Sequence, residues 1–284
     1  MTYVTRFAPS PTGLLHLGHA YSALVAHDRA HAHGGRFLLR MDDIDSDRCK
    51  PVYEQRAIDD LAWLGLTWDG PIWRQSQSLP AFDAALATLG DKGLLYPCAC
   101  SRRDIDLAAG APQEGAPTHG PDGRIYPGTC RGRSLAERGP TDALRLDMAK
   151  ALTHVPRPIR FCETGPLYGG PHELDPTTLR EAVGDVVLSR RSGGPAYHLA
   201  VVIDDHAQGI TEVTRGADLF DATQIHVLLQ HLLELPVPDY HHHDLIRDET
   251  GKRLAKRDDA RALATYRAAG QTPDDIRRLV GLSS

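Results

Sequence analysis

Two short stretches near the start of the chain carry residues suited to phosphate chemistry. The run Arg6-Phe7-Ala8-Pro9-Ser10-Pro11-Thr12-Gly13 is followed closely by His16-Leu17-Gly18-His19. Apolar residues then recur at helical spacing, so a short strand, an irregular loop and a helix N-terminus are expected in that order. The free N–H groups of a helix N-terminus attract phosphate, imidazoles can donate to its oxygens, and Gly18 permits close approach. A lone pair of histidines more often merely caps a helix, so the surrounding pattern has to carry the prediction.

That surrounding pattern is a strand–helix–strand unit. Arg36 to Met41 forms a second apolar stretch after Gly34-Gly35, and Asp42, Asp43 and Asp45 follow it directly. Open α/β sheets bind ligands at the carboxyl ends of their strands. The aspartates and histidines are therefore expected at one edge of a parallel sheet.

The two stretches resemble the nucleotide-binding motif of class I aminoacyl-tRNA synthetases, which reads HIGH in the family and HLGH here. The RFAPSPTG prefix resembles the glutamyl and glutaminyl branch, and in particular its truncated paralogues. The resemblance implies an α/β fold: a Rossmann-like catalytic domain, an inserted zinc-containing α+β module and a short helical C-terminal part. We expect boundaries at 1–95 and 189–240 for the two halves of the catalytic domain, 96–188 for the insert and 241–284 for the C-terminal part.

Composition fits an ordinary globular protein. The 284 residues are 41% hydrophobic and 24% charged, with a formal net charge of −5. No apolar run is long enough to span a bilayer, and no basic-then-apolar leader is present at the N-terminus. We expect a cytoplasmic monomer without a membrane partner. A net negative charge does not indicate a general nucleic-acid binder, so local arginine clusters would have to contact any RNA.

Periodicity predicts the other elements. Apolar stripes indicate helices from Pro51 to Gly65 and from about Ser78 to Gly93. The run 196–205 is so apolar that we expect a buried strand or a strand–helix junction. A strand at 210–215, a helix at 222–235, a strand at 245–246 and an interrupted helical tail at 260–282 complete the prediction.

Three of the five cysteines have a spacing that suits a metal. Cys98, Cys100 and Cys130 enclose a Gly- and Pro-rich stretch that cannot bury much core, and structural zinc would supply the missing stabilisation. Chemistry alone favours His119 or Asp122 as the fourth ligand, whereas the resemblance implies Tyr126. Ordinary buried thiols remain the alternative for the three cysteines. Cys49 and Cys162 are expected to be structural.

The run His241-His242-His243 also invites a metal interpretation. Neighbouring side chains on an extended segment point to opposite faces. We therefore expect no metal there.

A basic segment near the C-terminus supplies a second motif. Arg253-Leu254-Ala255-Lys256-Arg257 resembles the KMSKS motif of the family, with Lys256 at its key lysine. The resemblance implies that His16, His19 and Lys256 are catalytic, and that these three residues and Gly18 bind ATP with its Mg²⁺. Displacement at the α-phosphorus requires such positioning and charge neutralisation.

The amino acid should be glutamate if the branch assignment holds. A buried carboxylate needs positive donors, and Arg6 and Arg215 match the arginines of the family. The resemblance also places Phe7, Ala8, Pro9, Ser10 and Tyr197 at the substrate. Asp42 stands where the family has a glutamate for the ammonium group, so the charge is kept with a shorter reach.

The expected reaction follows from the truncated branch. Its members activate glutamate with ATP and transfer it to the cyclopentenediol of queuosine in the anticodon of tRNA(Asp). The chain ends soon after Lys256, where longer relatives continue into an anticodon-reading domain. Two alternatives stay open: a glutamate–tRNA ligase that charges a tRNA 3′ end, and a non-catalytic, zinc-bearing RNA-binding protein.

Overall fold

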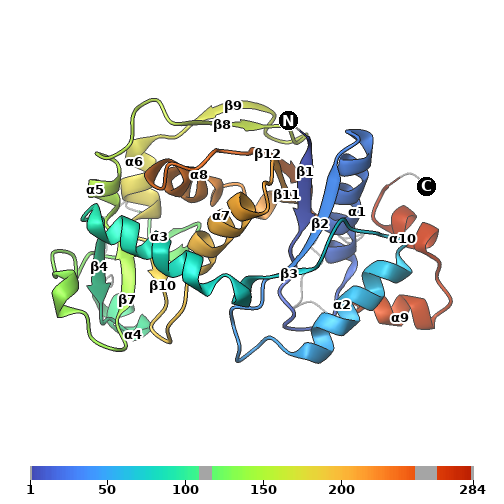
Figure 1. Cartoon of the computed structure of the whole chain (residues 1–284), viewed down its shortest axis with the longest axis horizontal. Helices are drawn as coiled ribbons and strands as arrows, with labels where there is room; N and C mark the ends of the chain where they lie inside the picture. The colour runs from blue at the N-terminus through green and yellow to red at the C-terminus, as the bar shows by residue number, and fades with distance from the viewer. Residues whose placement is uncertain (1, 109–116, 247–260, 283–284) are drawn as a thin grey trace.

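The computed structural model describes residues 2–108, 117–246 and 261–282 (Figure 1). The segment with Lys256 and the rest of the KMSKS-like motif lies outside these ranges. Among the described residues, no helix combines the length and the apolar character needed to cross a membrane.

The first ninety residues alternate strands with helices, as predicted. The strands β1 (Val4–Phe7), β2 (Arg36–Met41) and β3 (Trp73–Arg74) form a parallel sheet in the order β1-β2-β3. The connecting helices are α1 (Leu17–Ala32), α2 (Pro51–Trp63) and α3 (Leu79–Asp91). Pro at the first turn of α2 and α3 suits a helix start, because the N–H that Pro lacks would have no partner there.

A second sheet continues from the other side of β1. Its strands, in the order β11-β12-β8-β9, are β11 (Glu212–Gly216), β12 (Asp239–His243), β8 (Arg160–Glu163) and β9 (Gly170–Glu173). The strands β11, β12 and β8 are parallel. β1 contacts β11, and Thr211 N donates to Val4 O at 2.9 Å beside it. The direction of winding therefore reverses between β1 and β11, where doubly wound sheets bind ligands.

The two faces of this sheet pack into separate cores. Val4 and Leu38 face a core shared with α3, α7 (Tyr197–Ala207) and α8 (Thr223–Leu232). Phe7, Phe37 and Leu39 face a second core formed with α1, α2 and the C-terminal helices. Because side chains alternate along a strand, a residue two positions after Val4 or Leu38 lies on the same face of the sheet as that apolar residue.

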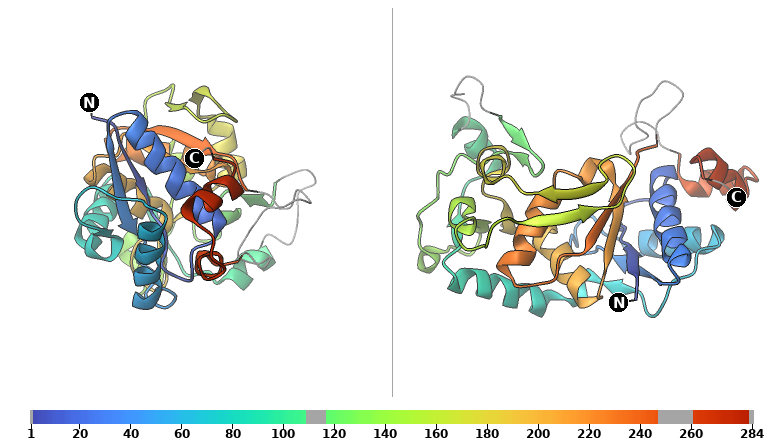
Figure 2. Two further views of the ribbon diagram at one scale, coloured as in Figure 1. Left: turned by 90° about the vertical axis from the view of Figure 1, so that its right-hand side faces the viewer. Right: turned by 90° about the horizontal axis from the view of Figure 1, so that it is seen from above.

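The remaining elements lie at the two ends of the molecule (Figures 1 and 2). The helices α9 (Leu263–Ala268) and α10 (Pro273–Leu279) pack beside α1 and α2. At the opposite end, β4 (Leu95–Cys98), β7 (Ala143–Leu146) and β10 (Val187–Ser189) form an antiparallel sheet in the order β10-β7-β4. The same end holds the hairpin β5 (His119–Gly120) with β6 (Gly123–Arg124), and the short helices α4 (Arg102–Ala108), α5 (Met148–Ala151) and α6 (Pro176–Thr178). Strands β8 and β9, at residues 160–173, return from this region, and β8 pairs with β12. The range 96–188 therefore contributes strands to the antiparallel sheet at this end and also to the sheet that contains β11 and β12.

Two predictions about elements were wrong. The run 196–205, expected to be a buried strand or a strand–helix junction, is the helix α7, which begins at Tyr197. A continuous apolar run does not distinguish a buried strand from a helix that is buried on most sides. Helix α7 is such a helix, because it is buried between the sheet, α3 and α8. Residues 245–246 form no strand; the strand lies just before them, at β12. The interrupted helical tail is confirmed by α9 and α10.

Candidate active site and candidate metal centre

A cleft of about 620 Å³ lies at the carboxyl ends of β1, β11 and β12. It is lined by every residue predicted to bind ATP or glutamate that lies within the described ranges: Arg6, Phe7, Ala8, Pro9, Ser10, His16, Gly18, His19, Asp42, Tyr197 and Arg215. Residues from opposite ends of the chain meet here, since Ile246 lines the cleft and Ala262 pairs with His16. These two residues stand on either side of the undescribed segment that contains Lys256.

The two histidines of HLGH are fixed by the start of α1. His16 caps the helix, with its Nδ1 accepting from Gly18 N at 3.1 Å, while His16 N donates to His19 Nδ1 at 3.2 Å. An imidazole that accepts at Nδ1 carries its proton on Nε2 when neutral. Each neutral ring therefore carries its proton on Nε2, next to the positive end of a 16-residue helix.

Arg6 belongs to a buried network of charges. Its Nε and one NH₂ nitrogen donate to the two oxygens of Asp205 on α7, at 2.8 and 3.1 Å. Arg40 of β2 donates to the same Asp205 at 2.6 Å and to Asp42 at 2.8 Å. Arg6 follows Val4 by two positions and Arg40 follows Leu38 by two, so both arginines face α7.

This network sets the protonation of its acids. Burial alone would raise the pKa of Asp205, but the Arg6 and Arg40 guanidinium groups lower it below its usual value. For Asp42, burial outweighs the attraction of Arg40 and raises the pKa. Asp42 thus lines the cleft as predicted, but one of its oxygens already accepts from Arg40.

Arg215 has a different environment. It leaves the end of β11 on the face of Val213 and is 6% exposed. Its donors meet His242 of β12, and His226 and Thr223 of α8. Tyr197, at the start of α7, lines the same cleft and is 40% exposed, so its ring lies where a ligand can reach it.

The histidine run on β12 behaves as predicted for an extended segment. His242 faces Arg215 and Glu163, whereas His241 and His243 turn to the other face and contact Thr164 and Ser22. The three side chains do not converge on one point.

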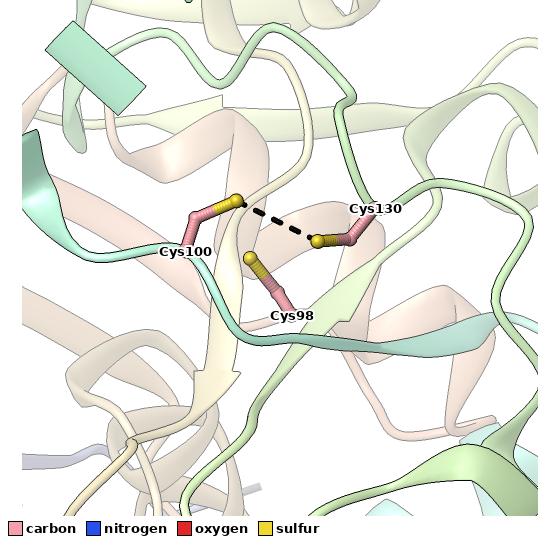
Figure 3. A group of neighbouring side chains, drawn as sticks. All are labelled: Cys98, Cys100 and Cys130. Carbon is pink, nitrogen blue, oxygen red and sulfur yellow. Dashed lines mark hydrogen bonds between the residues drawn. The ribbon is translucent and has the colours of Figure 1, made fainter. Parts of the chain in front are cut away.

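Three sulfur atoms converge at the far end of the molecule (Figure 3). The Sγ atoms of Cys98, Cys100 and Cys130 all lie within 4.8 Å of one another, with Cys100 and Cys130 3.5 Å apart. The Tyr126 hydroxyl lies 3.3 Å from Cys98 Sγ and 3.5 Å from Cys100 Sγ. Sulfurs that share a tetrahedral zinc ion are about 3.8 Å apart, as follows from Zn–S bonds of about 2.3 Å. The donor set therefore fits zinc in type and spacing.

The alternative fourth ligands do not lie at this cluster. Asp122 accepts from His198, and the exposed His119 bonds to Thr118. The thiols have unequal acidity. Burial raises the pKa of Cys100 to about 11. Burial also acts to raise the pKa of Cys130, but its hydrogen bonds with Tyr126, the Ala99 backbone and the other two thiols together outweigh burial and lower that pKa to about 7. Metal binding would deprotonate the thiols. Cys162 is exposed and has no such neighbours within the described residues.

Sequence reasoning missed several residues that support the cleft. Asp205 holds Arg6 and is itself held by Arg40, while His226 supports Arg215 directly and Glu163 supports it through His242. A signal was present for Asp205, since two acids end an otherwise apolar run at 204–205. Nothing local in the sequence pointed to His226 or Glu163, because their partners are distant in the chain.

The fold and the cleft define an enzyme class. The family profile described as tRNA synthetases class I (E and Q), catalytic domain, matches residues 2–120 and 175–283. The chain belongs to this family, which confirms the family predicted from HLGH and its prefix. It is therefore a ligase of the class I aminoacyl-tRNA synthetase type, with a mixed α/β catalytic domain.

Among curated relatives, glutamyl-Q tRNA(Asp) synthetase from Rhodobacter capsulatus is 62% identical over 282 residues, covering 98% of this chain and 100% of that protein. The enzyme of the same name from Nocardia farcinica is 43% identical, with 97% of this chain and 82% of that protein covered. A crystal structure of a glutamate tRNA ligase from Elizabethkingia meningosepticum, in complex with its amino acid, is 27% identical with a TM-score of 0.76. It is matched over 99% of this chain, which spans only 61% of the length of that ligase.

Proposed function

We propose that this chain activates L-glutamate with ATP and transfers the glutamyl group to queuosine in the anticodon of tRNA(Asp), as a cytoplasmic monomer. The observation that carries the proposal is that the cleft residues meet in one place, in a chain similar over 98% of its length to glutamyl-Q tRNA(Asp) synthetase from Rhodobacter capsulatus. The similarity to glutamate tRNA ligase covers a smaller share of that enzyme and supports the same first step.

In the first step, a carboxylate oxygen of glutamate attacks the α-phosphorus of Mg²⁺-bound ATP. A phosphorus–oxygen bond forms, the bond to the β-phosphate breaks, and pyrophosphate leaves. His16 and His19 would donate from Nε2 to the phosphates, next to the N-terminus of α1. Lys256 would neutralise charge from the opposite side; this role rests on the sequence motif.

The amino acid would lie between the two buried arginines. Arg6, Arg215 and Asp42 all line the cleft. Arg215 would bind the side-chain carboxylate of glutamate, supported by Arg6, and Asp42 would face the ammonium group. Phe7, Ala8, Pro9 and Ser10 would form the wall beside the substrate, and Tyr197 would donate a hydrogen bond to it.

In the second step, a hydroxyl of the queuosine cyclopentenediol attacks the acyl carbon of glutamyl-adenylate. An ester forms, the hydroxyl proton is lost, and AMP leaves. The names of the relatives favour this acceptor over a tRNA 3′ end.

The decisive experiment is glutamate-dependent exchange of labelled pyrophosphate into ATP, in the absence of tRNA. We expect exchange by the native protein and a loss of two orders of magnitude or more, about 3 kcal/mol, in Lys256→Ala. An absence of exchange, with or without glutamate, would reject the proposal and favour a non-catalytic RNA-binding protein.

The acceptor is then mapped with labelled glutamate and tRNA(Asp) that carries or lacks queuosine. We expect an alkali-labile label in the anticodon fragment after nuclease digestion, and no label on the queuosine-free tRNA. Label on the 3′-terminal fragment would instead identify a glutamate–tRNA ligase.

We also propose that Cys98, Cys100, Tyr126 and Cys130 hold a structural zinc ion. The three clustered sulfurs and the adjacent phenol support it. Zinc there would stabilise a region whose own apolar cluster is small: Tyr96, Cys98 and Tyr126 are its buried members.

Metal analysis tests the zinc proposal. Native protein should contain about one zinc per chain, and C100S should lose it and unfold at a lower temperature. C162S is the matched control, because Cys162 is exposed and away from the cluster. Equal zinc content in both variants would exclude this site.

A further inference from the structure

Arg215 is held entirely by neutral acceptors among the described residues. Its Nε donates to His242 Nε2 at 3.0 Å, and its Nη1 donates to His226 Nδ1 at 3.0 Å. Its Nη2 donates to Thr223 Oγ1 at 2.7 Å and to the Leu219 carbonyl at 3.2 Å. A guanidinium group only donates, so both imidazole nitrogens must accept.

This requirement fixes which nitrogen carries the proton in His226 and, beyond it, in His198. Because His226 accepts at Nδ1, its proton is on Nε2, which meets His198 Nδ1 at 3.0 Å. His198 must therefore accept at Nδ1 and carry its proton on Nε2, 3.0 Å from Asp122 Oδ1. Asp122 lies in the β5–β6 turn, and an ionised carboxylate can only accept. In the series Arg215, His226, His198 and Asp122, each residue therefore donates to the next one.

His242 completes the support on the other side. It accepts from Arg215 at Nε2, so its Nδ1 carries the proton and donates to Glu163 Oε2 at 2.5 Å. Glu163 is itself held by the backbone N–H groups of His242 and Gly165. The two imidazoles thus set the plane of the Arg215 guanidinium from two different nitrogens.

We propose that His226 is a positioning residue for the substrate carboxylate. Its Nδ1 holds Nη1 of Arg215 in the orientation that binds the anion, and His198 and Asp122 fix the tautomer that makes this possible. The inference rests on the proposed function, in which Arg215 binds glutamate.

Burial makes the neutral imidazole the stable form. His226 is 2% exposed, and burial lowers its pKa well below the ordinary value. The Arg215 charge beside it lowers the pKa further, as do the groups His198, Arg6 and His242. A charged imidazole would lose its acceptor at Nδ1 and repel Arg215.

Two substitutions test the roles of the two imidazole nitrogens of His226 separately. In H226N, the amide lies at the position of Nδ1 and its oxygen can still accept from Arg215. In H226Q, the amide lies near the position of Nε2, so it can still reach His198 but offers Arg215 no acceptor at the original place. KM values for glutamate and for ATP are measured by pyrophosphate exchange without tRNA, with the melting temperature of each variant.

We expect H226Q to raise the glutamate KM roughly tenfold, the loss of one charge-assisted hydrogen bond, with an unchanged ATP KM. H226N should stay within about threefold of the native glutamate KM, because it keeps the acceptor. In the native protein, ¹⁵N NMR should show His226 as the Nε2–H tautomer at neutral pH.

The positioning role is overturned if both variants raise the glutamate KM alike, if neither does, or if the ATP KM rises equally. An Nδ1–H tautomer for His226 would also overturn it. These outcomes differ from a failure of the proposed function, in which the native protein itself would show no glutamate-dependent exchange.

Discussion

The two arginines of the cleft are buried to the same degree but held in opposite ways. Arg6 is 5% exposed and Arg215 is 6% exposed. Arg6 shares Asp205 with Arg40, so its charge is largely offset inside the protein. Arg215 meets imidazole, hydroxyl and carbonyl acceptors instead.

The difference separates a cation whose charge is already paired inside the protein from one that is better suited to hold an anionic ligand. A buried ion pair offsets the desolvation of both partners, and removing one partner leaves an uncompensated charge. A buried guanidinium with neutral acceptors keeps much of its attraction for an added carboxylate. We therefore expect changes near Arg6 to act mainly on stability and changes at Arg215 to act mainly on glutamate binding.

Asp205→Asn should disrupt the charge network around Arg6 and give the largest loss of stability. It leaves Arg6 and Arg40 without their shared counter-charge and should cost about 3–5 kcal/mol of unfolding free energy. Urea unfolding at pH 7 measures this cost. A loss below 1 kcal/mol would mean that the charge network contributes little to folding.

Arg215→Met should remove the cation that is held by neutral acceptors, and we expect it to affect glutamate binding more than stability. Glutamate kcat/KM in pyrophosphate exchange should fall by about 10²–10³, while unfolding free energy changes by less than about 1 kcal/mol, since an unpaired buried charge is removed. Stability loss as large as in Asp205→Asn would erase the distinction between the arginines.

The neutral histidines should make the protein sensitive to acid. Burial lowers the pKa of His226, His242 and His243 below 6.5, and that of His241 to about 4. These residues take up protons on unfolding, so stability is fully present above pH 6.5 and is lost as pH falls from there toward the lowered values. The raised pKa values of Asp42 and Asp204 oppose this trend.

Unfolding free energy measured from pH 7.5 to 5 checks the sign, and we expect it to decrease. His241→Asn should flatten the slope, because it removes one of the lowered pKa values. A stability that rises toward pH 5 would mean that the aspartates dominate.

The smallest expected effect is at Asp42. Asp42→Glu restores the longer acid of the family and should lower the glutamate KM by less than about fivefold, the range between a water-bridged and a direct contact. The ATP KM serves as the internal control. A rise in glutamate KM would show that the Arg40–Asp42 contact at 2.8 Å needs the shorter side chain.

Local pattern was enough to predict much of the fold. Strand β2 was expected at 36–41 and is observed there, α2 begins at Pro51 as predicted, and α3 begins at Leu79, next to the predicted start at Ser78. The prediction was wrong at 196–205, where an apolar run without periodicity fits a strand and a buried helix equally well. The glutamate and ATP residues within the described ranges line one cleft, although their roles stay predictions.

The sequence by itself determined the family, the strand–helix alternation and which residue types reach the cleft, because motifs and periodicity are local properties. Only the tertiary structure decided that Arg6 is paired with Asp205 and that Arg215 depends on His226. Those contacts join β1 to α7 and β11 to α8. Charge compensation depends on distances between elements that no local pattern specifies.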